Sequence, residues 1–189
     1  MSTRTTRTLA SAAAALVAGG VLVASQAGAQ GTAPAGSADE HPGGSGWTPY
    51  QQPDIHYSAG QRCEFPVEGK VVLDQEEYRD VSHWPGGQVR TQLWRGALVI
   101  RWTNLESGES VRRDQSADAI AEYASDGSLE SLTSLRGSFG AGIPEGGHPG
   151  KGAYVVGGRW SSVVFEDDGT RTIVLGPRGI LENLCETLG

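Results

Sequence analysis

Short runs in which hydrophobic residues alternate with polar ones follow one another from about residue 57 to residue 189. A period of two is typical of β-strands that bury one face, and turn residues separate the runs. The segments that predict strands are 63–67, 70–73, 88–94, 97–104, 116–124, 153–166 and 170–175. The pattern predicts an antiparallel all-β domain of about seven or eight strands.

Turn chemistry predicts three hairpins between these segments. Asp-Gly pairs at 126–127 and 168–169 separate hydrophobic runs, and glycine adopts the positive φ that such tight turns require. A third turn lies in "TNLESG" at 103–108. Because the side chains of Asn104 and Ser107 can bond the local backbone, we interpret this segment as a chain reversal rather than a chemical site.

Two segments carry leucines at spacings that suit a helix. Leucine recurs every third residue in 129–135, which fits a helix face or a strand, and the preceding Asp-Gly turn favours a strand. The tail from Ile180 to Leu188 has hydrophobic residues at helical spacing. We therefore expect a strand at 129–135 and a short C-terminal helix.

One open sheet would leave a hydrophobic face and two edges exposed, so we expect either an antiparallel up-and-down barrel or a two-layer sandwich. Glycine pairs at 86–87 and 157–158 lie before one predicted strand and inside another. Glycine in a strand marks a bulge or a bend, which a closing barrel needs. This favours the barrel over the sandwich.

The N-terminal 29 residues have the pattern of a signal peptide. Arg4 and Arg7 precede the uncharged segment 9–24, and Ala27-Gly28-Ala29 forms a small-residue cleavage site. The apolar segment is too short for a membrane-spanning helix. We expect a signal peptide at 1–29, a Gly/Pro/Ser-rich flexible leader at 30–56 and one all-β domain at 57–189, secreted to the extracellular space without a membrane span.

Charge and cysteine content extend this picture. The chain has a net charge of −7, and removal of 1–29, which holds two arginines and no acids, leaves −9. This balance argues against nucleic acid as a partner. Cys63 and Cys185 are the two cysteines, and in an oxidising compartment we expect them to form a disulfide that joins the start of the domain to its C-terminal helix.

The sequence contains no recognisable catalytic or metal-binding motif. The four histidines are scattered, and no nucleophile elbow or zinc signature occurs. The acidic stretch at 74–80 is typical of a solvent-exposed surface. We therefore predict no catalytic residue, no metal site and no cofactor.

Three tryptophans on predicted strands stand next to arginines: Trp94 beside Arg95, Trp102 beside Arg101 and Trp160 beside Arg159. Neighbouring strand residues face opposite sides. Either the tryptophans belong to the core and the arginines to the wet face, or the arginines line a barrel lumen and hold an anionic ligand. Under the second interpretation, the candidate ligand-binding set is Arg101, Arg159, Trp102 and Trp160.

Four segments carry a family resemblance: "TNLESGES", "ASDGSL", "YVVGGRWSSVVFEDDGTRTIVLGPRG" and the terminal "LCETLG". Over 98–189 the chain resembles a group of small secreted all-β proteins of actinobacteria, of uncharacterised function. The resemblance implies export and an all-β fold, and it supplies no catalytic residue. The segments "DQEEYRD" and "VRRDQ" depart from that group and leave room for a specialised role.

These observations favour a secreted non-catalytic protein that binds a small molecule or an extracellular protein. The alternative is a barrel-cavity enzyme of cyclase or isomerase type, which only fold analogy supports. An apolar cavity above a few hundred Å³ with converging Arg, His or Glu would favour ligand chemistry, whereas an interior filled by side chains would favour a binding or structural role.

Overall fold

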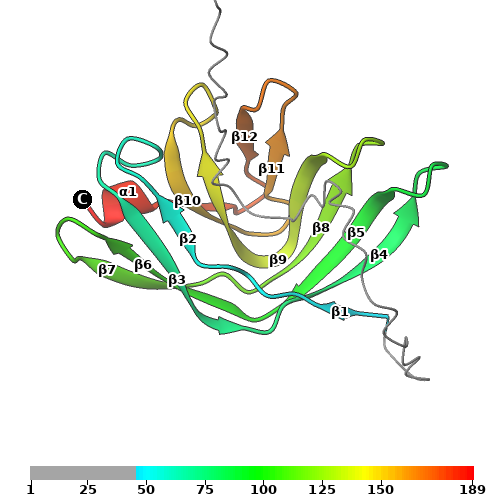
Figure 1. Cartoon of the computed structure of the whole chain (residues 1–189), viewed down its shortest axis with the longest axis horizontal. Helices are drawn as coiled ribbons and strands as arrows, with labels where there is room; N and C mark the ends of the chain where they lie inside the picture. The colour runs from blue at the N-terminus through cyan, green and yellow to red at the C-terminus, as the bar shows by residue number, and fades with distance from the viewer. Residues whose placement is uncertain (1–45) are drawn as a thin grey trace, which may run out of the picture.

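The computed structural model describes residues 46–189 (Figure 1). The predicted signal peptide at 1–29 and the leader up to residue 45 lie outside this part. The all-β prediction is confirmed: the described chain forms antiparallel sheets and one short helix, α1 (Leu184–Thr187), near the C-terminus. Residues 46–189 form thirteen strands, more than the seven or eight predicted, and several of them are very short.

The larger sheet has nine strands in the order β1-β4-β5-β8-β9-β10-β13, with β11 paired to β9 and β12 to β11. Its strands are β1 (Thr48–Pro49), β4 (Glu77–His83), β5 (Val89–Gly96), β8 (Ala117–Tyr123), β9 (Leu129–Ile143), β10 (Gly152–Gly157), β11 (Ser162–Phe165), β12 (Arg171–Val174) and β13 (Ile180–Asn183).

The smaller sheet has four strands in the order β2-β3-β6-β7. They are β2 (Ile55–Tyr57), β3 (Val67–Asp74), β6 (Leu98–Asn104) and β7 (Ser110–Asp114). Within the described residues the two sheets do not close into a barrel, so the favoured barrel form is replaced by the sandwich alternative.

The chain passes between the two sheets at a crossing point that involves β3, β4, β5 and β6. β3 pairs with β6 in the small sheet, whereas the next strands, β4 and β5, pair in the large sheet. The chain changes sheet at Gln75 and again at Gly96, where Gln75 N donates to Ala97 O over 2.8 Å. Gly96 has φ 138°, and any side chain there would collide with the Gln75 backbone. The strand pair β4–β5 of the large sheet thus continues into the pair β3–β6 of the small sheet (Figure 1).

The core consists of two hydrophobic clusters on opposite faces of β10, whose six residues are all buried. Tyr154 and Val156 belong to the cluster within the large sheet. Ala153 and Val155 belong to the cluster that includes residues of the small sheet and α1. Because successive side chains of a strand point to opposite faces, this one strand joins both clusters.

The long strand predicted at 153–166 is two strands. β10 pairs with 138–143 of β9, and β11 pairs with 131–133 of the same edge. The chain steps between these positions through Gly158 and Trp160, which have φ 95° and 65°. The glycine pair at 157–158 thus marks a bend, as predicted, but the bend separates two strands.

The three predicted hairpins are confirmed. Their glycines, Gly108, Gly127 and Gly169, have φ of 78°, 87° and 84°. The segment 129–135 is a strand, as predicted. The predicted C-terminal helix is confirmed in a shorter form, because Ile180 and Leu181 belong to β13, which pairs with β10, and only 184–187 is helical.

Asn104 stabilises the "TNLESG" turn and also connects it to the C-terminal segment. Its Oδ1 accepts hydrogen bonds from Glu106 N and Ser107 N at 2.9 and 3.3 Å, as the turn chemistry predicts. Its Nδ2 also donates to Leu188 O at 3.0 Å. The side chain is 4% exposed, so this residue fastens the hairpin to the C-terminal segment.

Replacing Asn104 with alanine is expected to lower the free energy of unfolding by about 1.5 kcal/mol, because a buried carbonyl and two turn N–H groups lose their partner. Urea unfolding measures this change. Ser107→Ala is the matched control: its hydroxyl accepts only the exposed Glu109 N, and its effect should stay below about 0.5 kcal/mol. Equal effects in the two variants would contradict the anchoring role.

The predicted disulfide between Cys63 and Cys185 is present. It joins the segment between β2 and β3 to α1, whose Leu184 is fully buried. Within the described chain no helix has the length and apolar character needed to cross a membrane.

Candidate ligand pocket between the two sheets

An open pocket lies where the two sheets separate. The cavity itself measures about 80 Å³ and lies within about 670 Å³ of empty space that includes open solvent. Its walls come from both sheets and from the segment that leads into β2. The lining residues are Tyr50, Gln52, Ile55, Glu76, Trp94, Leu98, Ile100, Gln115, Ala117, Ala119, Leu132, Phe139 and Gly140.

Part of the pocket lining is aliphatic, and some of its residues are small. Leu98 and Ile100 contribute from β6, while Ala117 and Ala119 contribute from β8. A Cβ at Gly140 would lie 2.8 Å from Gln115 Oε1, so the glycine leaves the space that Gln115 occupies. Glycine and alanine among the lining residues of β8 and β9 leave space that larger side chains would fill.

Two polar groups at this pocket are buried without a hydrogen-bond partner among the described residues: Glu76 Oε2 and Gln115 Nε2. Gln115 is only 2% exposed. An unsatisfied buried polar atom costs on the order of 1–3 kcal/mol, and native proteins retain few of them. Two such atoms on one pocket indicate that something else supplies their partners.

The indole N–H of Trp94 is also buried without a hydrogen bond of normal geometry. It lies close enough to the Tyr123 hydroxyl to act against the burial that raises the pKa of Tyr123. Because the Trp94 N–H has the Tyr123 hydroxyl as a polar neighbour, we take only Glu76 and Gln115 as the polar groups that await a ligand.

Burial controls the charge of Glu76. Desolvation, followed by the negative charge of Asp74, raises the pKa of Glu76 from 4.5 to about 7. Asp74 is committed to the backbone: its Oδ1 accepts from Glu76 N at 3.0 Å and its Oδ2 from Gln52 N at 2.6 Å. Among the described residues, neither carboxylate has a basic side chain within 4.0 Å.

Aromatic rings surround the same end of the pocket. Tyr50 meets Trp94 edge-on at 5.1 Å between ring centroids, and Tyr78 lies 5.3 Å from Trp94. Trp47 packs against the guanidinium groups of Arg95 and Arg79 at 3.9 and 5.0 Å. Trp47 and β1 do not line the pocket, whereas Tyr50, Gln52 and Ile55, which also belong to the predicted leader, form part of its wall.

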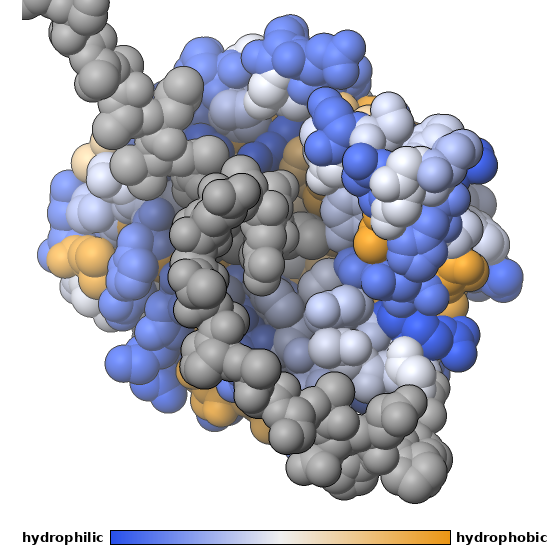
Figure 2. Space-filling view, turned by 45° about the vertical axis from the view of Figure 1, so that its right-hand side comes forward, coloured by the Kyte–Doolittle hydropathy of each residue, from blue (hydrophilic) through white to orange (hydrophobic). Residues whose placement is uncertain are grey.

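A second open groove runs along the opposite side of the crossing, but its charges are mutually satisfied. Arg95 pairs with Glu77 and Arg136 with Asp118, each at 2.6 Å. On the face shown in Figure 2, hydrophobic residues form only small patches among hydrophilic ones. The inter-sheet pocket is therefore the better candidate.

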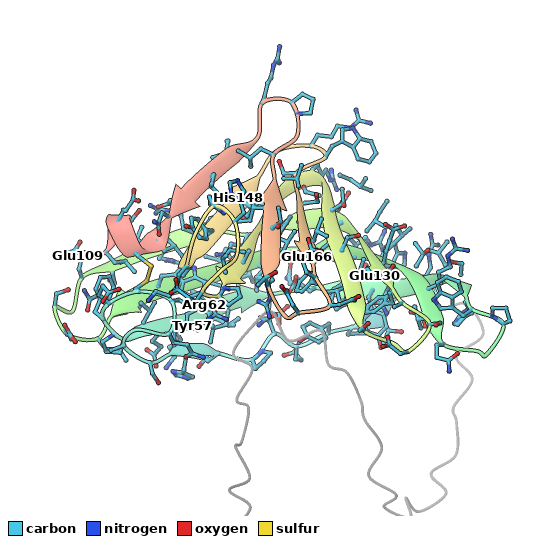
Figure 3. The ribbon with its side chains drawn as sticks, turned by 90° about the horizontal axis from the view of Figure 1, so that it is seen from above. Tyr57, Arg62, Glu109, Glu130, His148 and Glu166 are labelled. Atoms are coloured by element: carbon cyan, nitrogen blue, oxygen red, sulfur yellow. A yellow bond between two sulfur atoms is a disulfide. The ribbon has the colours of Figure 1, made fainter. Side chains whose placement is uncertain are left out.

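Two further buried polar groups lie side by side beneath the loop that carries His148 (Figure 3). The guanidinium of Arg62 lies 5.3 Å from the Tyr57 ring centroid, and its Nη1 donates to Gln61 O at 2.8 Å. Neither residue lines the inter-sheet pocket.

The predicted ligand-binding set occupies two separate places. Trp102 is 2% exposed and packs in the core, while Arg101 beside it is exposed on the small sheet. Arg159 and Trp160 are exposed in the turn between β10 and β11, with the guanidinium 5.0 Å from the indole centroid. The core-and-wet-face interpretation describes Trp102 and Arg101, and ligand binding by the four residues stays a prediction.

Sequence reasoning missed Glu76 and Gln115. The acidic stretch at 74–80 was interpreted as a solvated surface, yet Glu76 Oε2 is buried. The available signal was position: Glu76 lies in the short link between the end of β3 at Asp74 and the start of β4 at Glu77. No serine, cysteine or histidine lines the described pocket.

No protein-family model, no curated protein and no solved structure matches this chain in the three comparisons made.

Proposed function

We propose that this protein is a secreted, non-catalytic module that binds a small molecule in the pocket between its sheets. The observation that carries the proposal is the pair of unpartnered buried atoms, Glu76 Oε2 and Gln115 Nε2, in an otherwise apolar pocket. Small-molecule sites typically combine apolar walls with a few polar groups that orient the ligand. The disulfide supports the expectation of export, since such bonds persist in oxidising compartments.

A pocket-filling variant tests the proposal. Ala117 lines the pocket and is partly exposed, so Ala117→Phe should occupy the space without rebuilding the core. Val174→Phe is the matched control, because Val174 is 49% exposed on β12 and does not line the pocket. The small apolar probe is indole, and saturation-transfer NMR measures its binding.

We expect the wild type and Val174→Phe to bind indole alike, and Ala117→Phe to bind it at least about fivefold more weakly, because the ring fills the apolar space. Equal binding by Ala117→Phe, or no binding by the wild type, would overturn the proposal.

A further inference from the structure

We infer that the ligand of this pocket is a small organic amine, bound as its ammonium ion, that also carries an oxygen acceptor. This inference rests on the proposed binding function and deepens it. Three features of the pocket support it: an acidic end, aromatic walls and a buried amide donor at another point of the lining.

The acidic end calls for a cation that can donate a hydrogen bond. Asp74 uses both carboxylate oxygens for backbone N–H groups, whereas Glu76 Oε2 is buried and unused. Within residues 46–189 no lysine, arginine or histidine lies within 4.0 Å of either carboxylate. An ammonium group would supply both the missing charge and the missing donor, and such charge-assisted hydrogen bonds are the stronger kind.

The rings of Tyr50 and Trp94 line the pocket beside Glu76. Aromatic faces carry partial negative charge and attract cations. An anionic ligand would meet a carboxylate and electron-rich rings together, so this end of the pocket disfavours anions.

Gln115 sets the second requirement. Its Nε2 can only donate, is buried without a described partner, and lines the same pocket. The ligand must therefore present an acceptor, such as a hydroxyl or carbonyl oxygen. Most of the remaining lining is apolar and includes residues of β6, β8 and β9, which suit a short hydrocarbon body.

Two compounds with the same skeleton test the inference. Leucinol carries an ammonium group, a hydroxyl and an isobutyl body; 4-methylpentan-1-ol lacks only the amine. Calorimetric titration at pH 8 compares them on the wild type, on Glu76→Gln and on Glu77→Gln. Glu77 is the matched control, because its carboxylate pairs with Arg95 and does not line the pocket.

We expect the wild type and Glu77→Gln to bind leucinol at least about tenfold more tightly than the alcohol. Glu76→Gln should lose this preference and still bind the alcohol, which shows that its pocket is intact. Equal or tighter binding of the alcohol by the wild type, or retained preference in Glu76→Gln, overturns the amine inference. Failure of both compounds overturns it too; if indole binds, the proposed function stands, and if indole fails, that function falls as well.

Discussion

Replacing Cys63 and Cys185 together with serine is expected to lower the free energy of unfolding by about 4–5 kcal/mol. The bond spans 122 positions of sequence, so its loss frees a large loop in the unfolded chain. It also joins α1 to the segment before β3, next to Leu184 and Leu188, which are 0% and 1% exposed. Urea unfolding of the oxidised wild type and the double variant measures the change.

Chemically reduced wild type is the control, because it loses the bond and keeps the same side-chain volumes. Its stability should match that of the double serine variant to within about 1 kcal/mol. A loss below about 1 kcal/mol in both proteins would contradict the prediction and would mean that packing of Leu184 and Leu188 holds the C-terminal segment by itself.

Replacing Glu76 with glutamine is expected to stabilise the protein by about 2 kcal/mol at pH 8 and to leave its stability nearly unchanged at pH 4.5. Burial raises the pKa of Glu76 to about 7, so the folded protein holds this proton more tightly than the unfolded chain does. As the pH rises from about 4.5 to 7, ionisation favours unfolding increasingly, and above 7 the penalty is constant. The expected stabilisation is smaller than the free energy that corresponds to the whole pKa shift, because Glu76 keeps some contact with solvent.

Unfolding of the wild type and Glu76→Gln from pH 4.5 to pH 8 measures this difference. Glu77→Gln is again the matched control: Glu77 pairs with Arg95 on the surface, so its removal should cost at most about 1 kcal/mol and should not stabilise the protein. A pH-independent effect of Glu76→Gln would contradict the desolvation of this carboxylate.

Glu76 thus has opposite expected effects on stability and on ligand binding. The carboxylate that weakens the folded state at pH 8 is the group expected to select an ammonium ion. Binding sites commonly keep a group that lowers the stability of the fold because the group is needed to bind the ligand.

Several features of the structure could be predicted from short stretches of the sequence. Asp-Gly turns at 126–127 and 168–169 and the Asn104 turn form within a few residues, so their hairpins do not depend on distant contacts. Alternation identified the all-β class, and the cysteine pair identified the disulfide.

The tertiary structure alone decided which strands share a sheet and where a charge is buried. The break after Gly157 depends on the two segments of β9 that receive β10 and β11. Glu76 lies in an acidic stretch whose composition indicates a solvated surface, and its burial comes from Tyr50, Trp94 and other residues far apart in the sequence. A turn depends on a few consecutive residues. The desolvation of a carboxylate depends on every residue that packs around it, wherever that residue lies in the sequence, so no local pattern could reveal the pocket.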